Sequence, residues 1–262
     1  NGTGLQGKTV SRAQLLRPFP QFSGVGSTLN GGFSWYHALS LRAEKRFSHG
    51  LTVQGTYTWS KYMEAVDKLN ASDPYPHHVV AAGDRPQHLV ISGIYELPFG
   101  RLKYWGDGWP AWAGHILGGW SVQGVYQGQS GPPLGFGNTA FYGSLHDIVL
   151  PRGQRKVERW FNTEAGFERD PRRQLGSNLR TFPMRLTGLR ADGFNNLDLS
   201  AFKTFRLAEG LRLQLRGEAN DALNHALFAG PNTGPVNTLF GTVSATNWNE
   251  QRKITVSARL MW

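Results

Sequence analysis

The last nine residues of the chain alternate between apolar and polar side chains, and this alternation constrains the fold more than any other feature. In an extended strand, successive side chains point to opposite faces. Thr255, Ser257 and Arg259 therefore share one face. The other face is entirely apolar and ends on an aromatic ring, with Ile254, Val256, Ala258, Leu260 and Trp262. The pattern predicts a strand with one apolar face and one water-exposed face.

The same two-residue rhythm returns through residues 35–262. The clearest case is a hairpin with arms of about 11 residues, in which Ser48-His49-Gly50 reverses the chain. Residues 1–34 carry Pro18 and Pro20, so we expect a loop there, or at most one edge strand. Long loops are expected near 62–86 and 131–180. Further strands are expected at 87–97, near 120–129, at one hidden position near 181–190, and at 196–205, 211–220, 239–246 and 252–262.

The length and rims of these strands favour a membrane wall. Strands of about 11 residues tilted by ~40–45° cross the core of a bilayer. Several apolar faces begin or end on aromatic residues such as Trp35, Trp59, Tyr95 and Trp120, as interface girdles require. No run of 18 apolar residues exists, which excludes a transmembrane helix. We therefore predict an all-β fold, an antiparallel transmembrane β-barrel with about nine or ten strands; a soluble β-sandwich binding module is the alternative.

The orientation of the strands tests this expectation. If Trp262 ends on the periplasmic side, loops 62–86 and 131–180 lie outside only when one hidden strand lies within 131–193. Residues 223–238 then fall on the inner side, where so long a loop is unusual.

Charged residues suggest a wet lumen and an anionic partner. The net charge is +10. Arg212, Gln214, Arg216 and Glu218 occupy one face of a strand and are expected to face the lumen. Because basic residues alternate with aliphatic ones along strands, we do not expect a nucleic-acid partner. A basic run in the expected outer loop is either solvated or contacts lipopolysaccharide phosphates or an anionic ligand; it comprises Arg152, Arg155, Lys156, Arg159, Arg172 and Arg173.

Catalytic and cofactor motifs are weak or missing. The chain lacks a Gly-x-Ser-x-Gly elbow, a P-loop and a dinucleotide fingerprint, so no catalytic residue and no cofactor is predicted. Asp73, His77, His78 and Asp84 share one loop and are weak candidates for metal binding, against the alternative of a solvated loop. A barrel hydrolase acting on lipids or esters remains an alternative, although no Ser and His spacing singles out a triad. The chain has no cysteine and therefore no disulfide.

Several segments, in order along the chain, resemble the C-terminal barrel region of TonB-dependent outer-membrane receptors, in particular the Oar-like group that bears a carboxypeptidase regulatory domain. One of them is Tyr95-Glu96-Leu97-Pro98-Phe99-Gly100. The full set covers residues 16–22, 36–39, 44–51, 57–61, 95–100, 118–122, 129–131, 160–163, 196–200 and 218–225.

This resemblance implies a bacterial outer-membrane location and a 22-stranded barrel closed by a plug domain and energised through a TonB box. The present sequence starts at Asn1 without Met, plug or TonB box, so we expect a processed or fragmentary chain that supplies the C-terminal part of such a barrel. The alternative is a shortened relative that closes as a small barrel of its own. The implied function is uptake or binding of an unidentified ligand. The implied partners are outer-membrane lipid and lipopolysaccharide, the missing N-terminal plug and barrel half, and the assembly machinery, which reads the apolar C-terminal residues 254–262 as its signal.

Overall fold

The computed structural model describes residues 9–17, 19–22, 30–101, 103–174, 178–247 and 251–262. The chain divides into two compact units, Asn1–Gly32 and Phe33–Trp262. The first unit contains a short helix, α1 (Arg12–Leu15), which is capped by the Ser11 side chain. No strand occurs among the described residues of this unit.

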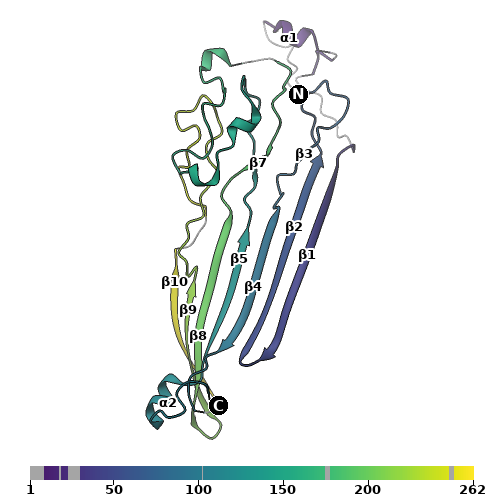
Figure 1. The fold of residues 1–262 in the computed structure, drawn as a ribbon. Coiled ribbons are helices and arrows are strands. Elements are labelled where there is room, and N and C mark those ends of the chain that lie inside the picture. The colour runs from purple at the N-terminus through teal and green to yellow at the C-terminus, as the bar shows by residue number, and fades with distance from the viewer. Residues whose placement is uncertain (1–8, 18, 23–29, 102, 175–177, 248–250) are drawn as a thin grey trace. The chain divides into compact units, whose positions relative to one another are not determined.

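The second unit is built around one antiparallel sheet whose seven long strands follow one another in chain order (Figure 1). They are β1 (Phe33–Ser48), β2 (Leu51–Ala65), β4 (Gln87–Glu96), β5 (Trp120–Gln129), β8 (Phe194–Ala208), β9 (Leu211–Asn220) and β10 (Lys253–Met261). A short strand, β3 (Val79–Val80), pairs with β2. A second, two-stranded sheet consists of β6 (Pro133–Leu134) and β7 (Leu186–Arg190). The predicted all-β antiparallel fold is therefore confirmed, with ten strands in the described part of the chain.

The register of the long strands aligns mostly polar side chains on one face of the sheet and mostly apolar side chains on the other. In one row, Gln123 lies opposite Ser200, Ser200 opposite Glu218, and Glu218 opposite Thr255. In the adjacent row the aligned residues are Val122, Ala201, Gly217 and Val256. Because side chains alternate along every strand, each face keeps its character from strand to strand. We call these the polar face and the apolar face.

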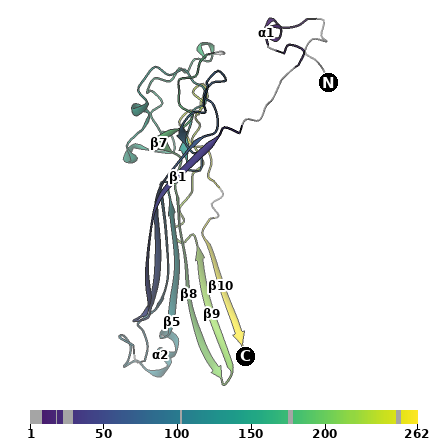
Figure 2. The ribbon, with the colours of Figure 1, turned by 90° about the vertical axis from the view of Figure 1, so that its right-hand side faces the viewer.

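The two ends of the sheet differ. One end, which we call the turn end, carries the tight turns β1–β2 and β8–β9 and the C-terminus (Figures 1 and 2). The β1–β2 turn needs positive φ at both central residues, His49 (53°) and Gly50 (77°), as in a type I′ hairpin. The opposite, loop end carries the described residues of 66–86, 130–193 and 221–252.

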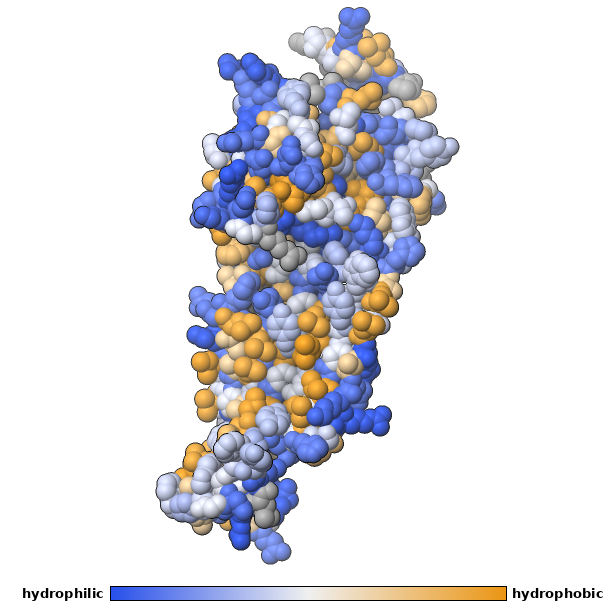
Figure 3. All heavy atoms as spheres, viewed as in Figure 1, coloured by the Kyte–Doolittle hydropathy of each residue, from blue (hydrophilic) through white to orange (hydrophobic). Residues whose placement is uncertain are grey.

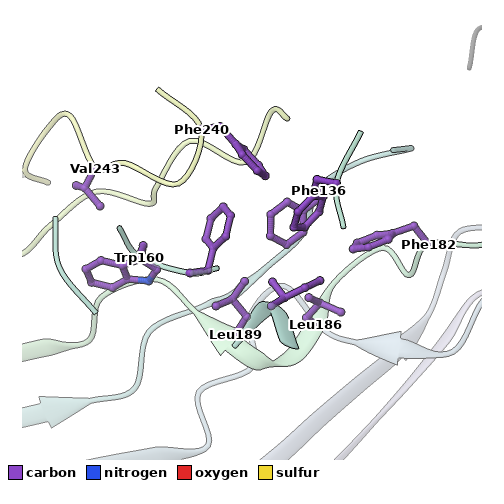
Figure 4. Close-up of a cluster of buried hydrophobic side chains, with 10 residues drawn as sticks. Phe136, Trp160, Phe182, Leu186, Leu189, Phe240 and Val243 are labelled. Atoms are coloured by element: carbon purple, nitrogen blue, oxygen red, sulfur yellow. The ribbon is translucent and has the colours of Figure 1, made fainter. Parts of the chain in front are cut away.

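The loops of the loop end pack around an aromatic core (Figure 4). Phe161 is fully buried and meets Phe136 edge-on, with ring centroids 4.9 Å apart. The buried members come from both long loops, and are Phe136, Ile148, Trp160, Phe161, Phe167, Phe182, Leu186, Leu189, Phe240 and Val243. We call the described residues of 130–193 and 221–247 the loop body. Its helical turns are η1 (Leu145–Ile148), η2 (Arg152–Gln154) and η3 (Pro171–Arg173).

Two of the strand expectations need correction. Residues 239–246 are not a strand, because Gly241 adopts φ 84° and the side chains of Phe240 and Val243 turn into the aromatic core. The expected strand near 181–190 exists as β7, but it pairs with β6 and is not part of the wall. With both changes, loop 223–238 falls on the loop end with the other long loops, and no hidden wall strand is needed.

One helix remains, α2 (Ala111–Leu117), in the segment that joins β4 to β5 at the turn end. No helix in the described part of the chain is both long and apolar enough to span a bilayer.

Candidate functional site

The polar face is the first candidate surface, and its side chains form a ladder across neighbouring strands. Arg216 donates to Gln123 Oε1 (3.4 Å) on β5 and to Ser200 Oγ (3.3 Å) on β8. Its Nε lies 2.8 Å from Glu218 Oε1, and its guanidinium lies over the Phe202 ring. A cavity of about 110 Å³ opens between these strands. The arrangement offers donors and acceptors to a hydrated or polypeptide surface.

A similar ladder runs across β1, β2 and β4. Gln54 donates to Ser92 Oγ (3.1 Å), and Arg42 pairs with Glu44 at 3.2 Å. Gln54, Ser92 and Arg42 border a second cavity of about 210 Å³ on the same face. The four residues expected to face the lumen, Arg212, Gln214, Arg216 and Glu218, lie on β9 in register with these polar rows.

The apolar face stays exposed in the structure. Val256 is 81% exposed and Trp262 93%, and Figure 3 shows hydrophobic residues gathered over the long strands, with hydrophilic residues over the loops. Among the C-terminal residues singled out from the sequence, Ile254, Val256, Ala258 and Leu260 lie opposite Ala219, Gly217, Leu215 and Leu213 of β9. These aliphatic side chains are therefore not enclosed in a dry interior.

Aromatic residues border this apolar face at two levels. Tyr57, Trp59 and Tyr126 lie toward the loop end, and Tyr95 and Trp120 toward the turn end. Trp59 pairs with Gln87, eight residues from Tyr95 along β4. At ~3.3 Å per residue the two levels are about 26 Å apart along the strand, or about 20 Å in height when tilted by ~40°.

A buried ion pair anchors the loop body to the wall. The Asp84 carboxylate is fully buried, accepts from the Tyr62 backbone N–H (2.7 Å) and pairs with Arg190 of β7 at 2.5 Å. Arg190 also donates to the Gly131 carbonyl (3.1 Å). Burial and the Arg190 cation lower the pKa of Arg85 below its ordinary value.

A second pair reinforces the anchor. Arg185 pairs with Glu64 of β2 and donates to the Val80 carbonyl (2.7 Å). Neither ion pair was predicted from the sequence. The apolar run Val79-Val80-Ala81, which ends three residues before Asp84, is the one signal that this part of the loop is buried.

The structure does not bring the candidate metal ligands together. Asp84 is engaged by Arg190, and Asp73 accepts from the Asn70 backbone N–H (2.7 Å). The His78 ring packs edge-on against Phe33 and Trp35, and His77 donates its backbone N–H to Asp67. Over the described residues, no three His, Cys, Asp or Glu side chains form a group able to hold a metal.

The basic residues of the loop body fall into two local groups. Arg155 donates to the Leu150 carbonyl (3.1 Å), and Lys156 and Arg159 exchange backbone hydrogen bonds in the next turn. Arg172 and Arg173 lie beside Asp170, and hydrogen bonds from Arg172 hold the pKa of that carboxyl below its ordinary value. The side chain of Arg152 lies outside the described part of the structure.

Comparison with known proteins identifies one family. A family model described as "Outer membrane beta barrel domain" matches residues 2–255. Neither a search of curated proteins nor a search of solved structures gave a match.

Proposed function

The chain belongs to the outer membrane beta barrel domain family and is located in the bacterial outer membrane, and on this premise we propose that it forms the C-terminal part of the barrel of a TonB-dependent receptor. The receptor would bind or take up a ligand through a larger barrel, to which this chain contributes seven wall strands and a body of outer loops.

The observation that carries the proposal is the direction of the two edge strands. Neighbouring strands alternate in direction, so β1 and β10, the first and seventh of the path, run the same way. Within the described residues, nothing pairs with the outer edge of either strand. In hydrocarbon, each unpaired backbone group costs several kcal/mol, so the sheet must close.

Joining β1 directly to β10 would create a parallel pair in an otherwise antiparallel wall. Closure by antiparallel pairs alone requires an odd number of further strands. A 22-stranded barrel of the plugged-transporter size leaves fifteen strands beyond these seven, which is odd. The parity therefore supports a larger barrel over a free-standing seven-stranded one.

The two faces support the same proposal. The apolar face between its aromatic rims is close in height to the ~25 Å apolar band of outer-membrane barrels. The polar face, with Arg216 and Glu218, suits a lumen that meets a plug domain. The loop end gathers three of the four long connections of the wall, as expected for the outer, ligand-facing side; the fourth, between β4 and β5, lies at the turn end.

We also propose the remaining partners from these surfaces. Arg155, Lys156 and Arg159 would contact lipopolysaccharide phosphates at the outer rim, and the apolar C-terminal strand would be read by the assembly machinery. We assign no catalytic role to this chain.

A genetic experiment tests the receptor role. The complete reading frame that contains this chain is deleted, and growth is compared with that of a TonB deletion strain on ferric chelates, corrinoids, oligosaccharides and oligopeptides as single sources. We expect both strains to lose the same source, and the reading frame to encode a plug and a TonB box before Asn1. Unchanged growth on every TonB-dependent source, or a reading frame without a plug, would overturn the proposal.

A further inference from the structure

The segment between β4 and β5 is unusual for the turn end of an outer-membrane barrel. Such turns are short, yet residues 97–119 include α2 and a set of aromatic residues. Tyr104 and Trp105 meet edge-on at 5.2 Å, and Phe99 stacks on Trp109 at 6.4 Å. The segment is therefore an ordered element with its own packing.

Helix α2 is attached to the apolar face of the wall. Trp120 of β5 and Lys203 of β8 lie opposite each other in an apolar row. Trp120 donates its ring Nε1–H to the Ile116 carbonyl (2.9 Å), and the Lys203 ammonium donates to the carbonyls of His115 and Ile116 (3.3 Å for Ile116). Both donors thus bind the last carbonyls of α2 from the lipid side of the sheet.

Lys203 explains why the helix lies there. A lysine on a lipid-facing row has no water to solvate its charge. Here it is 6% exposed, its ammonium is held by carbonyls at the helix end, and it lies 4.7 Å from the Phe205 ring centroid. Cations interact favourably with helix C-termini and with aromatic faces. Lys203 is therefore a positioning residue that fixes α2 on the wall.

The side of α2 that faces away from the wall is mostly apolar, with His115 as an exposed polar residue. Ala113 is buried, whereas Trp112 is 68% exposed, and Ile116, four residues later, 55%. Residues four apart share one face of a helix. Leu117 and Trp105 are also exposed. This apolar surface continues the apolar face of the sheet past its turn-end aromatic rim.

We propose that residues 99–117 are an interfacial anchor, in which Trp105, Trp112 and Ile116 insert among the phospholipids of the periplasmic leaflet. Phospholipid is the occupant that fits, because the surface is continuous with the lipid-facing band and indole rings favour the headgroup level. The flanking Arg101 and Lys103 are exposed cations beside it, although Lys103 is paired with Glu96 at 3.2 Å; long basic side chains of this kind reach toward lipid phosphates. This inference rests on the outer-membrane location and is independent of the receptor role.

Single spin labels test the anchor. The chain has no cysteine, so Trp112→Cys and Ile116→Cys are introduced one at a time into the complete gene product, with any cysteine outside residues 1–262 replaced. Accessibility to oxygen, which partitions into lipid, and to a water-soluble nickel chelate is measured in phospholipid vesicles. The controls are Val256→Cys on the apolar face and Glu209→Cys in the β8–β9 turn at the same end.

We expect labels at 112 and 116 to favour oxygen as the label at 256 does, and the label at 209 to favour nickel. Labels at 112 and 116 that behave like 209 while 256 stays in lipid would overturn the anchor and leave the barrel intact. Labels shielded from both reagents would indicate a protein partner and also overturn it. A water-exposed label at 256 would overturn both the anchor and the membrane wall.

A second variant tests the attachment. Lys203→Met removes the ammonium from the helix end, and we expect the label at 112 to become at least twofold more mobile while the label at 256 is unchanged. Unchanged mobility at 112 would contradict the positioning role of Lys203.

Discussion

The carboxylate of Asp84 pairs with the Arg190 guanidinium at 2.5 Å, and the two residues are separated by 106 positions in the chain. Asp84 lies three residues before β4, in the loop that leads into it, and Arg190 ends β7 in the loop body. One buried contact thus ties the outer loops to the wall. Loss of one partner would leave the other charge buried and unpaired.

Asp84→Ala is expected to destabilise the loop body by about 3–5 kcal/mol, the usual cost of breaking a buried pair. The double variant Asp84→Ala/Arg190→Met should recover a large part of this loss, because no charge then stays unpaired. Limited proteolysis of residues 131–193 at increasing urea measures the effect. Asp170→Asn, which removes an exposed pair with Arg172, is the control and should leave the profile unchanged. Equal profiles for Asp84→Ala and Asp170→Asn would contradict the anchor.

Phe161→Ala should open both long loops together. Phe161 is fully buried and contacts rings from 130–193 and, through Phe240, from 221–247. A large-to-small change at such a site costs about 3–5 kcal/mol. Protease cleavage should therefore increase in both loops at the same urea concentration, whereas Tyr142→Ala, at a 75% exposed ring, should shift it by less than about 0.5 kcal/mol. Cleavage confined to one loop would show that the loop body is not one unit.

Gly50→Ala and Gly210→Ala separate backbone strain from contact in the two tight turns. Both glycines have positive φ, 77° and 79°, so each alanine should cost about 1–2 kcal/mol. A Cβ at Gly50 would also lie 3.1 Å from the Glu96 carbonyl oxygen, whereas a Cβ at Gly210 would have no heavy atom of another residue within 4 Å. We therefore expect Gly50→Ala to lower the urea midpoint of unfolding more than Gly210→Ala. The reverse order would argue against this turn geometry.

An arginine scan of β10 should distinguish the two faces of the wall. Val256→Arg places a charge on the apolar face near the middle of the strand, where the expected cost is about 2–4 kcal/mol. Ser257→Arg places the same charge on the polar face and should be tolerated. The ratio of compact to unfolded protein on unboiled gels measures the difference. Equal losses for the two variants would be inconsistent with a lipid-facing row at 254–262.

Alternation was sufficient to predict the wall. All seven long strands lie at positions that the two-residue rhythm predicted, because each side chain of a membrane wall meets either lipid or water. The expected length of about 11 residues was too short for β1, β2 and β8, which have 16, 15 and 15 residues. The same logic failed at Leu239-Phe240 and Val243, where apolar residues serve a local aromatic core and Gly241 breaks the extended backbone.

The contacts that position the candidate surfaces could not be predicted in this way. Asp84 with Arg190, and Lys203 with the end of α2, join residues 106 and 87 or more positions apart. The alternation of side chains along a strand carries no information about pairs so far apart in the sequence. Lys203 interrupts the apolar row of β8. The carbonyl groups at the end of α2 that bind its ammonium are identified only in the folded structure.

Thiol reactivity along β10 tests the central claim, a single wall with lipid on one side and water on the other, most directly. Cysteines are placed one at a time at positions 254–261 of the complete protein in outer-membrane vesicles and reacted with a water-soluble maleimide. We expect a strict two-residue period, with reaction at 255, 257 and 259 and protection at 254, 256, 258 and 260. Uniform reactivity, or protection at the odd positions with reaction at the even ones, would contradict the account.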